Sequence, residues 1–296
     1  MKAHIALFFV SLIYAANYTI AKEVMPTYLT PDTLVFMRVL TGVVIFWILA
    51  AMKSEKVEKS DFGRLILCGV FGAAANMLFF FKGLNLTTPI NASLLLLLVP
   101  IIVIIISGIF LKERITVFKG LGIILGILGA GFLVLNGRSV SWSSSGLVGD
   151  LLVGLNSTAF AIYLILVKQL MVKYNTMTVL KWVFTFGFIA VFPFTINDFL
   201  AADFTNIPIN IWFAISFILI CVTVLTYLFN AYALQYVTAS VVSIYIYLQP
   251  LMASIIALSF GKDNLDFGKV MAYLLIFSGV LMVSQSRDWW KGVLKW

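Results

Sequence analysis

The sequence predicts an all-α membrane protein with ten transmembrane helices in two five-helix inverted-topology repeats. Three observations lead to this prediction: the apolar composition, the spacing of the apolar segments, and an internal repeat whose copies face opposite sides of the membrane. The chain has 296 residues, of which 62% are hydrophobic and 11% are charged, and its mean hydropathy is +1.08. A soluble domain carries roughly a quarter charged residues. We therefore expect the bilayer to be the main solvent.

Ten apolar segments each approach the ~20 residues that an α-helix needs to cross the hydrocarbon core. Backbone N–H and C=O groups find no water there, so each segment is expected to be helical. The first segment resembles a signal peptide, but its apolar run continues to Ala21 without a clear small-x-small cleavage site, so we expect it to be retained. The predicted spans are 3–22, 32–52, 62–82, 88–110, 115–136, 147–169, 176–197, 209–232, 238–260 and 267–286.

An internal repeat divides the chain into two halves. The stretch Gly83–Gly137 aligns without a gap on Ala233–Arg287, and about 12 of the 55 aligned pairs are identical. Each copy is an apolar helix with a proline in its middle, a charged turn and a second apolar helix. We therefore expect one five-helix repeat over 1–137 and another over 147–287. The most unusual matched pairs are Pro100 with Pro250, Lys112 with Lys262, Glu113 with Asp263, Lys119 with Lys269 and Gly129 with Gly279.

The basic residues predict the orientation in the membrane. With the N-terminus in the cytoplasm, 14 Lys and Arg fall on the cytoplasmic side and 5 on the other, as the positive-inside rule requires. We expect a multi-pass protein of the cell (inner or plasma) membrane with both termini cytoplasmic. Because five helices is an odd number, the second half begins on the opposite side, and the copies are inverted. Inverted repeats are the geometry from which alternating access arises.

Several motifs occur together in a fixed order: Tyr14-Ala-Ala-Asn17 followed by Lys22 and Pro26, Phe36-x-Arg38, Pro100, and Leu111-Lys-Glu-Arg-Ile-Thr116 before a glycine-rich helix. In this pattern the chain resembles the EamA family of the drug/metabolite transporter (DMT) superfamily. The second half departs from the pattern, because Val183 stands where the counterpart of Arg38 falls and Asp263 replaces the usual glutamate. The resemblance implies a ten-helix carrier that exports or exchanges small metabolites, amino acids or drugs.

The two matched prolines are predicted to act as hinges in the walls of a cavity. Proline lacks a backbone N–H, which disturbs the carbonyl four residues earlier, here Leu96 and Ile246. Such carbonyls need another partner in a membrane, so broken helices often line cavities. The alternative is a packing kink without contact to a ligand.

Polar side chains within the spans are the candidate substrate-binding residues. A buried amide without a partner is costly, and tyrosine offers an apolar face with a polar tip. In the ninth span, Ser240, Ser243 and Tyr247 share one face, and a second line joins Tyr245 to Gln249. Alternatively, Ser and Thr bond their own helix and the aromatic rings belong to the core or the interface. The cavity candidates are Tyr14, Asn17, Tyr18, Asn76, Asn91, Asn156, Tyr163, Thr226, Asn230, Ser243 and Tyr247.

Arg38 is the one charge well inside a predicted span. One interpretation is structural: its side chain extends toward the interface and pairs with Asp32 or Glu23. The other is functional, as an anion-binding or gating charge. Gly122 and Gly126 form a GxxxG motif, which predicts close helix packing either within the chain or between chains.

The sequence offers little for catalysis. It shows no metal-ligand cluster, phosphate-binding loop or nucleophile–base pair, and it contains one histidine, His4. We expect no enzyme activity, cofactor, metal or nucleic-acid partner. Proton coupling is not supported either, because no Asp or Glu falls in the middle of a span.

These observations favour a secondary transporter for small metabolites, with amino acids or similar amphipathic solutes as substrates. Its partners are the solute and the bilayer, and its oligomeric state is left open, a monomer included. A cavity is expected between the halves, with the resemblance placing helices one, three, four, six, eight and nine around it. A lipid or glycolipid flippase and a phosphorylated-metabolite exchanger remain as alternatives.

Overall fold

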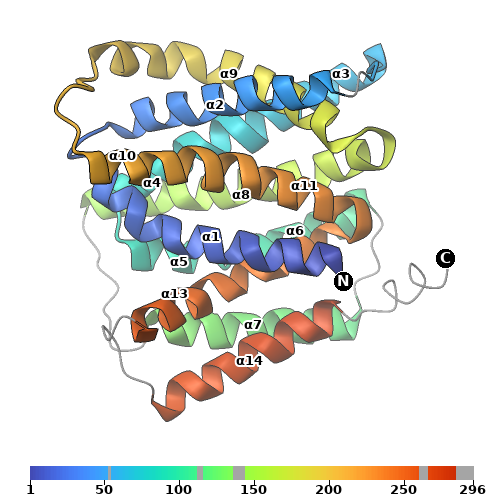
Figure 1. The fold of residues 1–296 in the computed structure, drawn as a ribbon. Helices are drawn as coiled ribbons and strands as arrows, with labels where there is room; N and C mark the ends of the chain where they lie inside the picture. The colour runs from blue at the N-terminus through green and yellow to red at the C-terminus, as the bar shows by residue number, and fades with distance from the viewer. Residues whose placement is uncertain (53–54, 112–115, 136–143, 260–265, 285–296) are drawn as a thin grey trace.

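The computed structural model describes residues 1–52, 55–111, 116–135, 144–259 and 266–284, and all regular elements in them are helical. Figure 1 shows these helices as a bundle. The α-helices are α1 (Lys2–Val24), α2 (Pro31–Ala51), α3 (Phe62–Cys68), α4 (Asn76–Leu86), α5 (Pro89–Leu96), α6 (Val99–Phe110), α7 (Val117–Leu135), α8 (Ser144–Lys173), α9 (Thr176–Ala201), α10 (Ile209–Ser216), α11 (Thr226–Tyr236), α12 (Ala239–Ile244), α13 (Leu248–Ser259) and α14 (Phe267–Ser284). Two short 3₁₀ turns, η1 (Lys59–Asp61) and η4 (Tyr245–Tyr247), and two π-helical segments, η2 (Gly69–Ala75) and η3 (Phe217–Leu225), complete the order.

Each predicted span contains a helix or a run of consecutive helices. In the described residues, six continuous helices are long and apolar enough to cross a membrane, and four shorter apolar helices accompany them. Large apolar side chains such as Ile109, Phe110 and Phe213 are about 70% exposed on the outer surface, where lipid would cover them. The helical membrane class predicted from the sequence is therefore confirmed. The matched pair Glu113 and Asp263, and the basic residues after position 284 that count toward the predicted orientation, lie outside the described residues.

Threonine and asparagine side chains mark several helix starts. Thr30 accepts the backbone N–H of Thr33 at 3.1 Å, and Pro31 occupies the first turn of α2. Thr88, Thr116, Asn175 and Thr238 accept N–H groups in the same way at the starts of α5, α7, α9 and α12. These caps satisfy donors that have no partner within the helix, which matters most where water is scarce.

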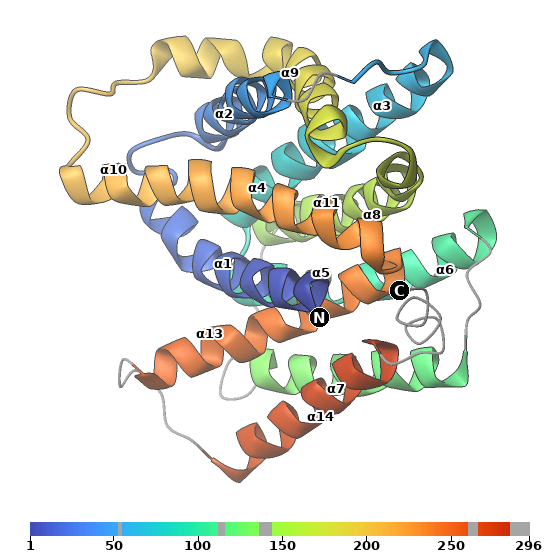
Figure 2. The same cartoon turned by 45° about the vertical axis from the view of Figure 1, so that its right-hand side comes forward.

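Two helix pairs lie at opposite edges of the bundle. Helices α7 and α14 pack against each other at one edge, and α2 packs against α9 at the other (Figures 1 and 2). Between these pairs, α1 contacts α11 and α13, while α8 contacts α4 and α6. Helix α1 thus packs against two consecutive helical runs from the second half of the chain, and α8 packs against two consecutive runs from the first half. The middle of the bundle is therefore built from both halves of the chain.

The glycines of the GxxxG motif bring two elements close to α7. A Cβ atom on Gly122 would lie 2.7 Å from the carbonyl oxygen of Gly279 in α14. A Cβ atom on Gly126 would lie 2.0 Å from the ring of Tyr247. Side chains at these positions would therefore overlap backbone or a buried ring. Of the two possibilities that the sequence left open, the structure shows the first: the motif packs helices closely within the chain.

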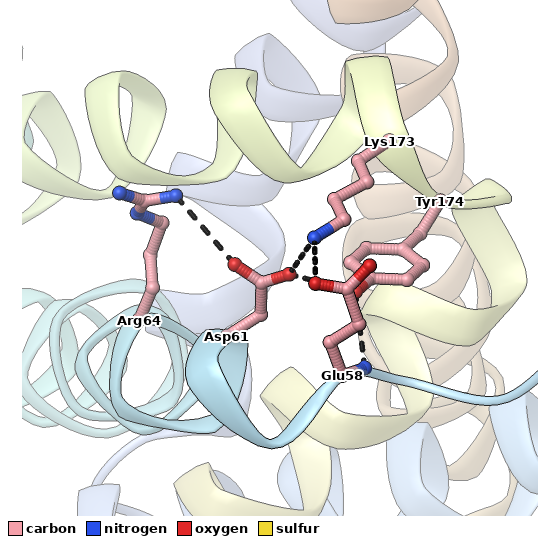
Figure 3. A network of polar contacts seen from close by, with 5 residues as sticks. All are labelled: Glu58, Asp61, Arg64, Lys173 and Tyr174. Carbon is pink, nitrogen blue, oxygen red and sulfur yellow. Dashed lines mark hydrogen bonds and ion pairs between the residues drawn. The ribbon is translucent and has the colours of Figure 1, made fainter.

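A polar network joins the segment before α3 to the end of α8 (Figure 3). Lys173 Nζ lies 2.6 Å from Glu58 Oε2 and 2.7 Å from Asp61 Oδ2. The Tyr174 hydroxyl donates to Asp61 Oδ2 at 2.7 Å and accepts the backbone N–H of Glu58 at 3.1 Å. Arg64 approaches the other oxygen of Asp61 at 3.9 Å. The network ties the α2–α3 connection to the α8–α9 connection.

Replacing Gly122 by Ala should destabilise the protein, because the new methyl group meets the backbone of α14, which cannot rotate away. Overpacking of this kind costs about 1–3 kcal/mol. Gly120 on the same helix is the matched control, since its Cβ would meet no atom within 4 Å. We expect thermal unfolding in detergent, followed by tryptophan fluorescence, to begin at a lower temperature for Gly122→Ala and not for Gly120→Ala. Equal unfolding temperatures for the two variants would contradict the close packing of α7 on α14.

Candidate functional site

A cavity lies in the middle of the bundle. Helices α1, α2, α4, α5, α8, α11, α12 and α13, together with η3 and η4, contribute to its walls. Its lining combines aliphatic and aromatic side chains with hydroxyls, amides and one guanidinium. The lining residues are Leu7, Val10, Ser11, Tyr14, Asn17, Tyr18, Arg38, Asn76, Met77, Phe80, Leu96, Asn156, Phe160, Val222, Tyr227, Asn230, Val242, Tyr245, Ile246 and Gln249.

Two broken helices form part of the cavity wall. The α5–α6 run is interrupted at Leu97 and Leu98, just before Pro100. The α12–α13 run is interrupted by the 3₁₀ turn η4, just before Pro250. Both prolines are buried. Leu96 and Ile246, the residues four positions before the prolines, line the cavity.

Hydroxyl groups from other helices add a second hydrogen bond to backbone oxygens at both breaks, where Leu95 also accepts the N–H of Leu98 and Tyr245 that of Leu248. Ser157 of α8 donates to the carbonyl oxygen of Leu95 at 3.1 Å, and Ser11 of α1 donates to that of Tyr245 at 2.8 Å. Each serine also bonds a carbonyl one turn back in its own helix, Val153 and Leu7 respectively. Such bonds hold non-helical backbone at a membrane depth where water is scarce.

Tyr247 links the two broken helices directly. Its hydroxyl donates to the carbonyl oxygen of Leu97 at 3.2 Å, and its ring packs on Gly126. Because Tyr247 is fully buried, its ring and hydroxyl form one fixed connection between the two interruptions.

Arg38 is buried, with 4% of its surface exposed, and it lines the cavity. Its Nε donates to Thr223 Oγ1 at 2.8 Å, its Nη2 donates to the carbonyl of Val222 at 3.3 Å, and its guanidinium carbon lies 4.7 Å from the centre of the Phe81 ring. The π-helical segment η3 supplies both oxygen acceptors. The interpretation that Arg38 pairs with an acidic residue of its own region is wrong.

The two acidic residues considered as partners for Arg38 lie elsewhere. Asp32 forms an ion pair with Lys82, with 2.9 Å between Oδ2 and Nζ. Glu23 is exposed at the end of α1. Arg38 is instead held by an element 185 positions further along the chain, a pairing that no local pattern indicates.

Amide and hydroxyl groups of the lining bond across the cavity wall. Tyr18 donates to Gln249 Oε1 at 3.1 Å, and Asn156 Nδ2 donates to the carbonyl of Asn76 at 2.8 Å. The oxygen Oδ1 of Asn17 differs, because it is buried and accepts no hydrogen bond from any described residue. At the beginning of α1, His4 Nδ1 and the Tyr245 hydroxyl are 2.7 Å apart.

The structure brings together most of the residues proposed from the sequence. Tyr14, Asn17, Tyr18, Asn76, Asn156 and Asn230 all line the cavity with Arg38. Five candidates lie outside its lining. Asn91 bonds Asp150, Tyr163 packs on Gly72, Thr226 bonds the carbonyl of Val222, Ser243 bonds that of Ser240, and Tyr247 bonds that of Leu97.

The sequence favoured one face of the ninth span, and the neighbouring face lines the cavity. Tyr245 and Gln249 point to it, whereas Ser243 and Tyr247 do not. Tyr245 and Gln249 are the second line that the four-residue spacing indicated, and contacts with His4 and Tyr18 of α1 hold this line toward the cavity. Ser11 and Tyr227 also line the cavity outside the proposed set.

The described part of the chain contains no group of three or more His, Cys, Asp or Glu side chains that could hold a metal ion. Arg38 is the only charged residue among the described residues that line the cavity. The site is therefore suited to binding an organic solute by shape, hydrogen bonds and one positive charge. Apolar walls with a few placed polar groups are the usual composition of small-molecule sites.

A helical bundle of this kind, with apolar outer faces and a partly polar cavity lined by most of its helices, is the architecture of a multi-pass membrane protein. The model of the EamA-like transporter family matches residues 1–135 and 147–285. The chain belongs to this family, within the DMT superfamily, and the resemblance seen in its motifs is confirmed.

Relatives of similar length support this assignment. "Uncharacterized transporter YyaM" of Bacillus subtilis (strain 168) is 27% identical over 294 residues, covering 96% of this chain and 94% of the relative. An "Uncharacterized transporter" of Archaeoglobus fulgidus is 26% identical over 288 residues, covering 97% and 98%. A crystal structure at 16% identity aligns with a TM-score of 0.74 over 95% of this chain and 96% of that chain, which supports the fold alone.

Replacing Tyr247 by Phe should weaken the link between the broken helices, because it removes the donor to Leu97 and keeps the ring on Gly126. A buried hydrogen bond contributes about 1 kcal/mol. The control is Tyr236→Phe, since Tyr236 is 64% exposed. We expect a lower unfolding temperature for Tyr247→Phe than for Tyr236→Phe. If the two variants unfold together, the hydroxyl at position 247 has no role in holding the breaks.

Proposed function

We propose that this chain is a secondary transporter that exports or exchanges small metabolites, amino acids or similar amphipathic solutes, by alternating access through the central cavity. It crosses the cell membrane ten times, in two inverted five-helix repeats with both termini in the cytoplasm. Its partners are the solute and the bilayer. The cavity carries this proposal, because it lies between segments of both halves and offers polar groups beside an apolar wall.

Matched contacts in the two halves support the inverted repeat. Ser157 bonds the carbonyl of Leu95, and Ser11 bonds that of Tyr245, 150 positions after Leu95. Lys22, near the end of α1, donates to a carbonyl near the end of α4. Lys168, near the end of α8, donates in the same way to carbonyls at the end of α11. The π-helical segments η2 and η3 precede α4 and α11 in the same way. Such pairs are expected if one half repeats the other about an axis in the membrane plane.

The broken helices support alternating access. Each half has an interruption, near Pro100 or Pro250, where some α-helical hydrogen bonds are already missing. The chain can therefore bend at these points while breaking few further hydrogen bonds. The Tyr247 hydroxyl, bonded to Leu97, lies between these points. We infer that the segments on either side of the prolines tilt in turn and open the cavity to one side of the membrane at a time.

The composition of the lining supports an amphipathic solute. Leu7, Val10, Phe80 and Phe160 provide an apolar wall, and the amides and hydroxyls lie opposite or between them. A phosphorylated metabolite carries about two negative charges and calls for more than one cation, whereas Arg38 is the single charged residue in the described lining. This favours a neutral or zwitterionic metabolite over a phosphorylated one.

The proposal is tested by counterflow in liposomes that contain the purified full-length protein. The panel comprises amino acids, sugar phosphates and a fluorescent phospholipid. We expect saturable counterflow of at least one amino acid. The variant Asn156→Trp should reduce it more than tenfold, because the indole would fill the cavity.

The matched control is Leu155→Trp, at the next residue of α8. Leu155 is 43% exposed, so its replacement faces outward. Counterflow should stay within about twofold of the wild type. Saturable flux that survives Asn156→Trp would contradict transport through this cavity. Movement of the phospholipid alone would favour the flippase alternative, and movement of the sugar phosphates alone would favour the exchanger.

A further inference from the structure

We propose that Arg38 binds the carboxylate of the transported solute and that Asn17 accepts a hydrogen bond from its amino group. This inference rests on the proposed function and names the chemical class of the solute: a small α-amino acid with an apolar side chain. The combination of an anchored guanidinium without a counter-ion and a buried acceptor without a donor, in one cavity, carries the argument.

The charge of Arg38 has no acidic partner in the described part of the chain. Its described contacts are two oxygen acceptors and the face of Phe81. Guanidinium stays protonated and has five N–H donors, of which these bonds use two. A buried cation without a counter-charge is costly, and a cation–π contact offsets only part of that cost. A carboxylate in the cavity would supply both the missing charge and the missing acceptors.

The contacts of Arg38 also orient it as a fixed binding group. The Thr223 hydroxyl donates to the carbonyl of Ile218 at 3.0 Å, which turns its lone pairs toward Arg38 Nε. The carbonyl of Val222 accepts from both Arg38 Nη2 and the Thr226 hydroxyl. One edge of the guanidinium is therefore held by η3 before any solute arrives. The remaining N–H groups have no described partner and belong to a side chain of the cavity lining.

This positive group occurs once in the two halves. Thr33 and Gly42 of α2 match Thr178 and Gly187 of α9, and in this alignment the counterpart of Arg38 is Val183. Val183 is fully buried and does not line the cavity. A residue required only to hold the fold of each half would be expected in both. A residue that recognises one end of an asymmetric solute is needed once.

Asn17 provides the second observation. The residue is 2% exposed and lines the cavity, and its buried Oδ1 atom has no hydrogen-bond donor among the described residues. A buried acceptor without a donor costs free energy that a bound N–H group would recover. An ammonium group is such a donor. An acceptor for nitrogen and a cation for a carboxylate together fit the two ends of an α-amino acid head group.

The affinity of three analogues with one shared side chain tests this inference. L-Leucine carries both groups, 4-methylpentanoate lacks the amine, and isopentylamine lacks the carboxylate. The measurement is the rise in unfolding temperature of the purified full-length protein with ligand concentration, which gives an apparent dissociation constant without any transport step. For the wild type, we expect L-leucine to bind at least 30-fold more tightly than isopentylamine, since a buried charge pair is lost with the carboxylate.

Two variants separate the roles of the two residues. Arg38→Gln should weaken L-leucine binding about 30-fold or more and leave isopentylamine unchanged. Asn17→Ala should weaken L-leucine binding about tenfold and leave 4-methylpentanoate unchanged. The control Lys82→Gln removes a cation that pairs with Asp32 outside the cavity, and it should bind L-leucine as the wild type does.

The wild-type comparison stands even if Arg38→Gln does not fold. Equal binding of L-leucine and isopentylamine by the wild type would overturn the carboxylate site, as would unchanged L-leucine binding by a folded Arg38→Gln. Binding of none of the three compounds would overturn the assigned solute class. Saturable counterflow of a different solute, blocked by Asn156→Trp, would then show that the transport proposal survives while this inference fails.

Discussion

The structure depends on one constraint: a helix interrupted inside an apolar bundle must find new partners for its backbone oxygens. Prolines at 100 and 250 follow the two interruptions, and water is scarce at that depth. Local backbone N–H groups supply part of these hydrogen bonds, and side chains from distant parts of the chain supply the rest, with Ser157 and Tyr247 serving the first break and Ser11 the second. Because these donors come from helices in both halves, satisfying the broken helices also assembles the bundle. The cavity lies where the two breaks and their donor helices meet.

Much of the helix pattern could be predicted from the sequence, because the length of apolar runs is fixed by the thickness of the bilayer. The side chains that line the cavity and their hydrogen-bond partners could not all be predicted. Helical spacing in the ninth span offered two lines of polar side chains, and tertiary contacts with α1 decide that the line with Gln249 faces the cavity where Tyr247 was expected. The partners of Arg38 could not be predicted because they depend on a tertiary contact between residues 185 positions apart. Amides in the spans were better guides than hydroxyls, since Ser243 and Thr226 bond carbonyls of their own segments.

The two halves are alike in architecture and unlike in what they present to the cavity. The first broken helix contributes Leu96, while the second contributes Val242, Tyr245, Ile246 and Gln249. The first half in turn supplies Arg38 and the polar face of α1, including Tyr14 and Asn17. Symmetric hinges with an asymmetric lining would allow similar movements toward each side of the membrane while a solute is held in one orientation. In the proposed mechanism, selectivity and movement reside in different residues of the same helices.

Alternating access requires this cavity to open to both sides of the membrane. It is tested most directly by a single cysteine at position 156, in a chain in which Cys68 and Cys221 are replaced by serine, exposed to a membrane-impermeant thiol reagent. Leu155→Cys in the same background is the control that faces outward. We expect the cysteine at 156 to react with reagent added from either side of oriented vesicles, and the solute to slow both reactions. Reaction from one side only, with or without solute, would contradict it.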